Sequence, residues 1–227
     1  MLEVSGLNAS YGRARILFDL DFTARAGEVT VLLGRNGAGK STTLKSLIGL
    51  VPPQSGEVRF AGRPVQGLQP YQIARLGLGY VPEDRRIFTD LTVAENLEVG
   101  RRPAREGIAP WTRARLYELF PSLGRMPDRL GARMSGGEQQ MLALARTLMG
   151  NPRALLLDEP SEGLAPVLAG ALARTIRELK SQGLTVLLCE QNLHFAQQVA
   201  DRAYLIEQGQ IRRSGTLQEI REEYQRL

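Results

Sequence analysis

Residues 34–41 of this 227-residue chain read GRNGAGKS, and they constrain its fold more than any other segment. Gly, four arbitrary residues and then Gly-Lys-Ser is a pattern typical of phosphate-binding loops. The apolar run VTVLL precedes it at residues 29–33, and Leu44, Leu47 and Ile48 follow at helical spacing. A loop that leaves a buried strand and enters a helix is the context in which this pattern binds a nucleotide. The alternative, a glycine-rich turn with a surface lysine, fits these flanks poorly.

Each residue type in this loop suits phosphate binding. Gly34, Gly37 and Gly39 allow backbone N–H groups to curl around phosphate oxygens, and the following helix points its positive end at them. Lys40 is expected to reach the β- and γ-phosphates and Ser41 to bind Mg²⁺. The predicted nucleotide-binding residues of the loop are Gly34, Arg35, Asn36, Gly37, Ala38, Gly39, Lys40, Ser41 and Thr42.

Two carboxylates, Asp158 and Glu159, end a second apolar run that reads LLLDE. Phosphoryl transfer to water needs a metal ion anchored to the protein and a base that orients the water. We predict that Asp158 holds Mg²⁺ through its water shell and that Glu159 polarises the attacking water, with Lys40 as a further catalytic residue. Two acids at a solvated strand end are the alternative, which loses weight because the phosphate loop is present.

A third segment, MSGGEQQ at residues 134–140, precedes an apolar helical pattern. Ser135 and Glu138 have the spacing of a capping box, so one interpretation is simply a well-capped helix. The other interpretation is a second phosphate cradle, because Gly136 and Gly137 lack side chains that would keep a phosphate from the helix amino terminus. One nucleotide needs one cradle, so we expect this one to serve a nucleotide held by another subunit.

The rest of the chain alternates apolar runs with helical periodicities, which is the pattern of strands joined by crossover helices in a largely parallel sheet. Residues 85–131 differ, because they contain four prolines and no continuous strand-like run, and we expect a mostly helical insertion there. The other predicted elements are strands at 154–157 and 184–189 and a helix that begins at Pro166 and ends just before Gly183. A hairpin at 203–206 and 210–213 and a last helix capped by Thr216 and Glu219 complete them.

Composition restricts the location and the partners of the chain. A single cysteine, Cys189, cannot form an internal disulfide, and we expect it to pack in the core. No apolar stretch approaches the roughly 18 residues of a membrane span, and the amino terminus lacks the layout of a secretory signal, so a cytosolic location is expected. The net charge of +5 comes from arginines interleaved with acids, which does not by itself favour nucleic acid.

Three segments, in this order along the chain, resemble the ATP-binding subunit of ABC transporters: GRNGAGKS, MSGGEQQ and LLLDEP. The resemblance covers essentially the whole chain. More narrowly, the chain resembles the smaller ATPase of bacterial branched-chain amino-acid importers, and less closely that of urea and amide importers, through YGRARIL, GYVPEDRRIF, TVAENL, YELFP, DEPSEGLAP and EQN.

The resemblance implies an α/β fold with a RecA-like P-loop core built on a parallel sheet. An amino-terminal antiparallel β portion and an inserted α-helical subdomain would complete it. Residues 1–227 would form a single ABC ATPase domain, with the core at about 1–84 and 148–227 and the helical subdomain at about 85–147.

It also implies a head-to-tail pair of ATPases, either identical or different, with two ATP molecules sandwiched between them. Each ATP would touch the phosphate loop of one chain and, in the other chain, the signature, which consists of Ser135, Gly136, Gly137 and Glu138. Hydrolysis would power import through two membrane permeases supplied by a periplasmic binding protein. The chain would lie peripherally on the cytoplasmic face of the inner membrane, and no nucleic-acid partner is expected.

Three alternatives remain open at this point. The chain could serve a urea or amide importer, or another ABC transporter such as an exporter. More remotely, it could be a DNA- or ribosome-associated ATPase of the same fold. Those proteins usually carry a coiled coil or a second ATPase half, which 227 residues with one phosphate loop do not accommodate.

Two further residues receive roles only through the resemblance. It makes Tyr11 the aromatic side chain that stacks on adenine, with a core tyrosine as the alternative. It places Glu83 where the family usually has Gln, so that Glu83 would join Ser41 and Asp158 around Mg²⁺. A surface glutamate paired with a neighbouring arginine is the alternative for Glu83.

The sequence departs from the family pattern at two positions. Leu164 replaces an aspartate that is usual in the loop after the carboxylates, although Ser161 is retained, so the two composite ATP sites of a pair could be unequal. Gln191 stands where a histidine is usual, and the chain's single histidine, His194, is expected to be a packing or surface residue. We predict that Gln191 is catalytic and donates its amide N–H to the γ-phosphate or the attacking water.

Overall fold

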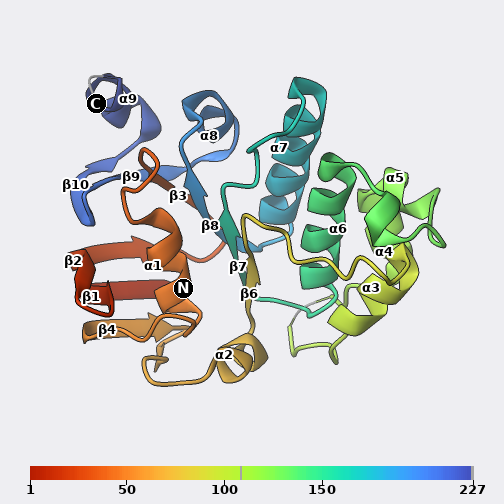
Figure 1. Cartoon of the computed structure of the whole chain (residues 1–227), viewed down its shortest axis with the longest axis horizontal. Coiled ribbons are helices and arrows are strands. Elements are labelled where there is room, and N and C mark those ends of the chain that lie inside the picture. Colours follow the sequence, from red (N-terminus) through yellow and green to blue (C-terminus); the bar gives the residue numbers. More distant parts are fainter. Residues whose placement is uncertain (108, 226–227) are drawn as a thin grey trace.

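The computed structural model describes residues 1–107 and 109–225. Two sheets form its framework: one of strand order β10-β9-β3-β8-β7-β6 and one of strand order β2-β1-β4-β5 (Figure 1). The elements along the chain are β1 (Leu2–Tyr11), β2 (Ala14–Ala24), β3 (Val29–Leu33), α1 (Lys40–Leu47), β4 (Ser55–Phe60), β5 (Arg63–Pro64), α2 (Pro70–Leu76), β6 (Leu78–Val81), α3 (Val93–Gly100), α4 (Arg113–Leu119), α5 (Pro121–Gly124), η1 (Gly131–Arg133), α6 (Gly136–Leu148), β7 (Ala154–Asp158), α7 (Pro166–Ser181), β8 (Thr185–Glu190), α8 (Leu193–Val199), β9 (Arg202–Glu207), β10 (Gln210–Gly215) and α9 (Leu217–Tyr224).

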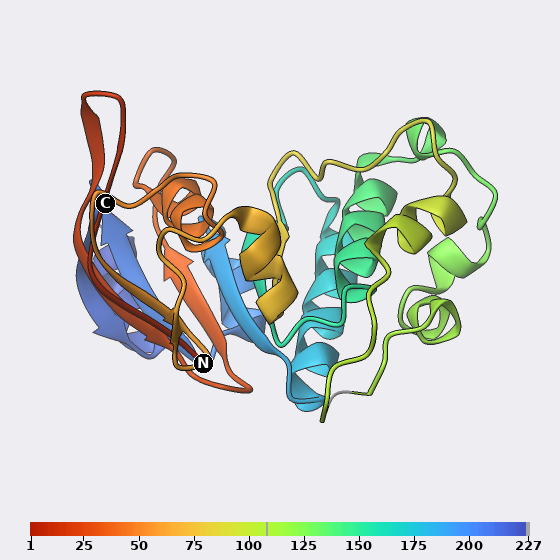
Figure 2. The ribbon, with the colours of Figure 1, turned by 90° about the horizontal axis from the view of Figure 1, so that it is seen from below.

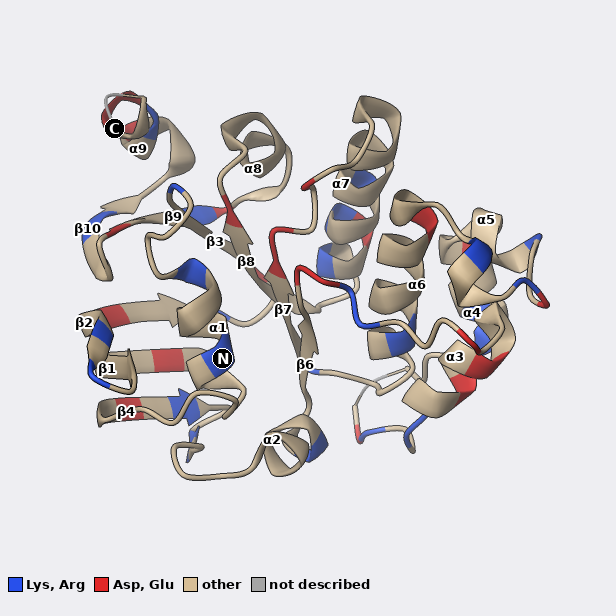
Figure 3. Cartoon of the chain, in the orientation of Figure 1, with Lys and Arg blue, Asp and Glu red and all other residues tan. Residues whose placement is uncertain are grey.

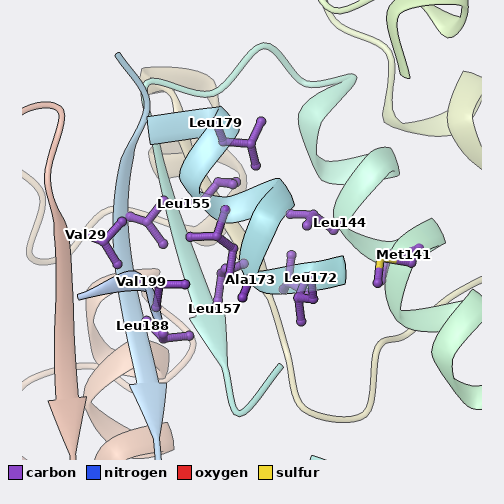
Figure 4. Packing of buried hydrophobic residues seen from close by; sticks show 14 of the residues in the cluster. Val29, Met141, Leu144, Leu155, Leu157, Leu172, Ala173, Leu179, Leu188 and Val199 are labelled. Carbon is purple, nitrogen blue, oxygen red and sulfur yellow. The ribbon is translucent and has the colours of Figure 1, made fainter. Parts of the chain in front are cut away.

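The central strands β3, β7 and β8 are buried along their whole length, as their continuous apolar runs predict. Side chains alternate between the two faces of the sheet: Leu155 and Leu157 join the core formed with α6, α7 and α8, whereas Leu156 joins the opposite core. Figure 4 shows the first of these cores, with Leu155, Leu157 and Leu188 facing the side chains of α7. The strands β9, β3, β8, β7 and β6 run parallel, which confirms the predicted α/β class.

The amino-terminal strands form the antiparallel portion that the family resemblance implies. β1 pairs antiparallel with β2 and with β4, and α1 lies between this sheet and the parallel strands (Figure 2). Leu44 and Leu47 of α1 are fully buried there, in the core that also contains Leu32 of β3. The phosphate loop that precedes α1 is therefore held between two sheets.

A group of helices, α3 to α6, stands on the other side of the parallel strands (Figure 1). The described part of residues 85–131 contains helices and no strand, in agreement with the predicted helical insertion. Trp111 and Phe120 are buried in the same core as α6 and α7. The boundaries at 84/85 and 147/148 remain a prediction.

The last elements are a hairpin and a helix, at the positions that the sequence predicts. β9 and β10 pair antiparallel, and Thr216 and Glu219 form the expected capping box at the start of α9. Leu217 and Ile220 anchor α9 in the core that lies over β9. Within the described residues, we find no helix with the length and apolar character of a membrane span.

Candidate active site

The phosphate loop connects β3 to α1, and its glycines are needed for two different physical reasons. Gly37 and Gly39 have φ angles of +79° and +107°, a left-handed backbone that favours glycine. Gly34 is needed for space, because a Cβ atom there would lie 2.5 Å from the carbonyl oxygen of Ile206. The loop can therefore curl toward the start of α1 only with glycine at these positions.

Lys40, the first residue of α1, carries a buried ammonium group at the centre of this loop. Its Nζ donates hydrogen bonds to the carbonyl oxygens of Gly34, at 2.8 Å, and Arg35, at 3.0 Å. The same Nζ lies 2.9 Å from Oε1 of Glu159, and both side chains are almost fully buried. Two residues that are 119 positions apart in sequence thus form one buried ion pair.

Asp158 ends β7 and accepts a hydrogen bond at each carboxylate oxygen. The hydroxyl of Ser41 donates to Oδ1 at 2.9 Å, and the hydroxyl of Tyr80 donates to Oδ2 at 3.2 Å. Burial raises the pKa of Asp158, the two hydrogen bonds oppose this shift, and the charge of Glu83 adds to it. No local signal in the sequence indicated Tyr80, which lies on β6 beside β7, because only the strand order brings it to Asp158.

Glu159 follows directly and sits in an unusual backbone conformation. Its φ is +44°, which is uncommon for a residue other than glycine, and its N–H donates to the carbonyl oxygen of Cys189 at 3.0 Å. Its Oε2 is buried and has no hydrogen-bond partner within the described part of the chain. A buried carboxylate oxygen without a partner is costly, and such strain is concentrated at functional sites.

Strand β8 ends beside these groups at Glu190, and Gln191 directly follows the strand. Glu190 is only 1% exposed, and burial raises its pKa. Gln191 is partly exposed, and His194 lies exposed on α8, as expected for a surface residue. Acidic segments gather at the carboxyl ends of β6, β7 and β8 (Figure 3). The carboxyl ends of parallel strands are where α/β proteins bind ligands.

The two residues assigned by resemblance alone are both exposed. Tyr11 ends β1 and is 49% exposed, which contradicts the alternative of a core tyrosine. Glu83 is exposed in the loop after β6. The structure also contradicts the ion-pair alternative for Glu83, because Arg86 pairs with Asp84 at 3.0 Å and Arg85 donates to Gln140 at 3.2 Å.

The signature lies at the start of α6, where Ser135 and Glu138 form the expected capping box. Ser135 N donates to Glu138 Oε2 at 2.7 Å, and Glu138 N donates to Ser135 Oγ at 3.3 Å. Gly136 is exposed, as a phosphate cradle requires. Gly137 is buried, and a Cβ atom there would lie 2.3 Å from Cδ1 of Leu168. Gly136 therefore has the exposure that a phosphate cradle needs. Gly137 does not, and its missing side chain instead allows α6 and α7 to pack closely.

The signature and the phosphate loop do not meet within one chain. Figure 1 shows α1 and α6 on opposite sides of the strands β6 to β8. The amino termini of these two helices therefore lie apart from each other. A ligand that touches both would have to involve a second molecule.

Comparison with known proteins gives the family. Residues 17–162, more than half of the chain, match the family described as ABC transporter. The chain belongs to the ABC transporter family. It is the subunit of an ABC transporter that binds and hydrolyses ATP, which confirms the prediction from the sequence motifs.

Several curated relatives match this ABC ATPase over nearly its whole length. The high-affinity branched-chain amino acid transport ATP-binding protein BraG of Pseudomonas aeruginosa is 42% identical, covering 93% of this chain and 91% of the relative. The probable branched-chain amino acid transport ATP-binding protein LivF of Archaeoglobus fulgidus is 38% identical, covering 98% and 94%. The lipopolysaccharide export system ATP-binding protein LptB of Haemophilus influenzae is 34% identical, covering 97% and 92%.

Solved structures confirm the ABC ATPase fold. The ATP-binding subunit of an ABC transporter superimposes with a TM-score of 0.85 at 30% identity, covering 99% of this chain and 93% of that structure. The mixed parallel core, the antiparallel sheet and the helices are therefore those of an ABC cassette.

Proposed function

We propose that this ATPase powers the import of branched-chain or related amino acids through separate membrane permeases. The observation that carries the proposal is the 42% identity to BraG over 93% of the chain. The 38% identity to LivF supports the same solute class. LptB, at 34% identity, makes lipopolysaccharide export the alternative that an experiment must separate.

The hydrolysis reaction is assigned to residues at the ends of β3, β7 and β8. Lys40 neutralises the β- and γ-phosphates of ATP from the phosphate loop, and Glu159 polarises the attacking water with its unpaired carboxylate oxygen. Gln191 donates its amide N–H to the γ-phosphate or to that water. Tyr11 stacks on the adenine ring, for which its exposed position at the end of β1 is suited.

Mg²⁺ fits the oxygen donors that this chain provides. Ser41 Oγ and Asp158 Oδ1 lie 2.9 Å apart, and both are hard oxygen ligands of the kind that Mg²⁺ prefers. We assign the ion to these two residues and, from the resemblance, to Glu83. When bound, Mg²⁺ would neutralise charge that develops on the phosphate oxygens.

A variant at position 191 tests the assigned role of the amide. Gln191→His should retain hydrolysis but acquire a pH dependence near the imidazole pKa of about 6.5, because the amide does not titrate and imidazole does. The measurement is the turnover number between about pH 5.5 and 8.5 for both proteins. Gln191→Ala should lower the turnover number, and unchanged activity in Gln191→Ala would contradict the role.

We further propose a head-to-tail pair in which ATP bridges two chains. The signature lies at the start of α6 and the phosphate loop at the start of α1, and these two helices stand apart in one chain (Figure 1). This supports the proposal, because one ATP could contact both segments only if they came from two chains. A second ABC ATPase, identical or different, would supply the missing half of each site. ATP would close the pair, and hydrolysis would remove the shared γ-phosphate and let it open.

A groove of about 860 Å³ between α2, β6 and the helices α3 and α6 suits the permease contact. The exposed large apolar side chains along this groove are Leu50, Tyr71, Phe88 and Val99. Exposed apolar side chains that line one groove favour contact with another protein. Contact with a membrane subunit here would hold the chain peripherally at the cytoplasmic face of the inner membrane.

Reconstitution tests the proposed solute. The chain would be co-purified with its membrane subunits and placed in proteoliposomes with candidate binding proteins. We expect ATP-dependent uptake of labelled leucine, isoleucine or valine. Uptake of urea or an amide instead, or release of lipopolysaccharide from the membrane, would overturn amino-acid import and favour the corresponding alternative.

A further inference from the structure

One peptide group beside the proposed catalytic site is held at both of its polar ends. Its carbonyl belongs to Gln191 and accepts a hydrogen bond from the hydroxyl of Tyr224 at 2.7 Å. Its N–H belongs to Asn192 and donates to Oε2 of Glu190 at 3.2 Å. Because a peptide group is planar, two such contacts at opposite ends prevent it from rotating about the neighbouring Cα bonds.

The carboxylate that holds the N–H end is itself fixed. Glu190 is 1% exposed, and its other oxygen, Oε1, accepts from the N–H of Ser161 at 3.1 Å. The backbone carbonyl of Glu190 accepts from the N–H of Gly34 at 3.1 Å. Glu190 therefore joins three segments: the phosphate loop, the loop that follows Glu159, and the turn that carries Gln191.

The hydroxyl that holds the carbonyl end comes from the last helix. Tyr224 lies at the end of α9, which is anchored by Leu217 and Ile220 in the core. The Tyr224 side chain is partly buried, and burial raises its pKa, so the hydroxyl stays protonated and able to donate. A change in the position of α9 would therefore move or break the hydrogen bond to the carbonyl oxygen of Gln191.

We propose that Tyr224 and Glu190 are positioning residues that together orient Gln191 for hydrolysis. The direction of the Gln191 side chain depends on the backbone on either side of its Cα atom, and these two contacts fix the peptide group on one side. The inference rests on the proposed catalytic role of Gln191. It adds that the last helix, α9, contributes to turnover without touching ATP.

The test replaces Tyr224 with Phe in the full chain, assembled with its companion subunits. Loss of one hydrogen bond from a positioning group should lower the turnover number about three- to tenfold. The KM for ATP should be unchanged, because the phosphate loop keeps its contacts. Tyr117→Phe is the matched control: the Tyr117 hydroxyl is buried and has no partner within the described residues, so its removal should leave turnover unchanged.

A double-mutant cycle separates positioning from a merely structural role. In a Gln191→Ala background, Tyr224→Phe should cause no further loss of turnover, because there is no amide left to orient. Glu190→Gln, which keeps the size of the side chain but has only one acceptor oxygen, should also lower the turnover number with KM unchanged.

The outcomes distinguish this inference from the proposed function. If Gln191→Ala has full activity, the proposed role of Gln191 is wrong. If Gln191→Ala lowers turnover but Tyr224→Phe and Glu190→Gln do not, the positioning inference is wrong while the role of Gln191 stands. Equal losses from Tyr224→Phe in both backgrounds would also overturn the inference, since the hydroxyl would then act independently of Gln191.

Discussion

Replacing Glu159 with Gln is expected to lower the turnover number for ATP hydrolysis by about 10²- to 10⁴-fold, the range typical for removal of a general base. The amide is nearly isosteric with the carboxylate but cannot accept a proton from the attacking water. ATP binding should survive, because Lys40 keeps both of its carbonyl contacts in the phosphate loop. Turnover is measured by phosphate release, and ATP affinity by calorimetry.

The control for this variant is Glu118→Gln, which makes the same chemical change at an exposed position of α4 and should leave turnover unchanged. The Glu159→Gln variant also tests the ATP-bridged pair. With MgATP and its companion subunit, it should remain associated, because the bridge is no longer hydrolysed. Failure to associate through the phosphate loop and the signature would contradict the ATP-bridged pair. Rapid hydrolysis by the variant would contradict the role of Glu159.

Replacing Lys40 with Met should have two effects at once. ATP affinity should fall about 100-fold or more, because a hydrogen-bonded cation in a buried phosphate site contributes several kcal/mol. The free energy of unfolding should also fall, by about 3 kcal/mol, because Glu159 would keep a buried charge without its partner. Calorimetry measures the first effect, and urea unfolding of the nucleotide-free chain measures the second.

A second substitution separates the two effects of Lys40. Adding Glu159→Gln to Lys40→Met removes the uncompensated charge, so part of the lost stability should return while ATP affinity stays low. If Lys40→Met were as stable as the parent chain, the ion pair between Lys40 and Glu159 would not be a stabilising contact. If ATP affinity were retained, the assignment of Lys40 to the phosphates would be wrong.

Much of the fold was predictable because the patterns that specify it are local. The buried strands β3, β7 and β8 are short continuous apolar runs, and such runs indicate strands covered on both faces. The capping boxes at Ser135 and Thr216 join residues three positions apart, within reach of one helical turn. The antiparallel amino-terminal sheet was predicted from the family resemblance and not from the periodicity of apolar residues.

The residues of the candidate site could be predicted only where neighbouring residues in the sequence form a recognisable motif. The loop at 34–41 and the pair Asp158 and Glu159 are such motifs, because their residue types and spacing alone suggest phosphate and metal binding. Glu190 lay within a segment that the resemblance used, yet nothing local indicated that its carboxylate would receive N–H groups from Ser161 and Asn192. The sequence also did not indicate that Gly137 lies beside Leu168, because this contact depends on how α6 and α7 approach each other.

The sequence alone determined the family, the phosphate loop and the pair of carboxylates, since these depend on residue types within a few positions of one another. Only the tertiary structure decided that Tyr80 reaches Asp158 and that Tyr224 reaches Gln191. The first contact crosses from one strand to the next, and the second joins the last helix to the end of β8. Such contacts depend on strand order and helix docking, which follow from the packing of the whole core and not from any local pattern.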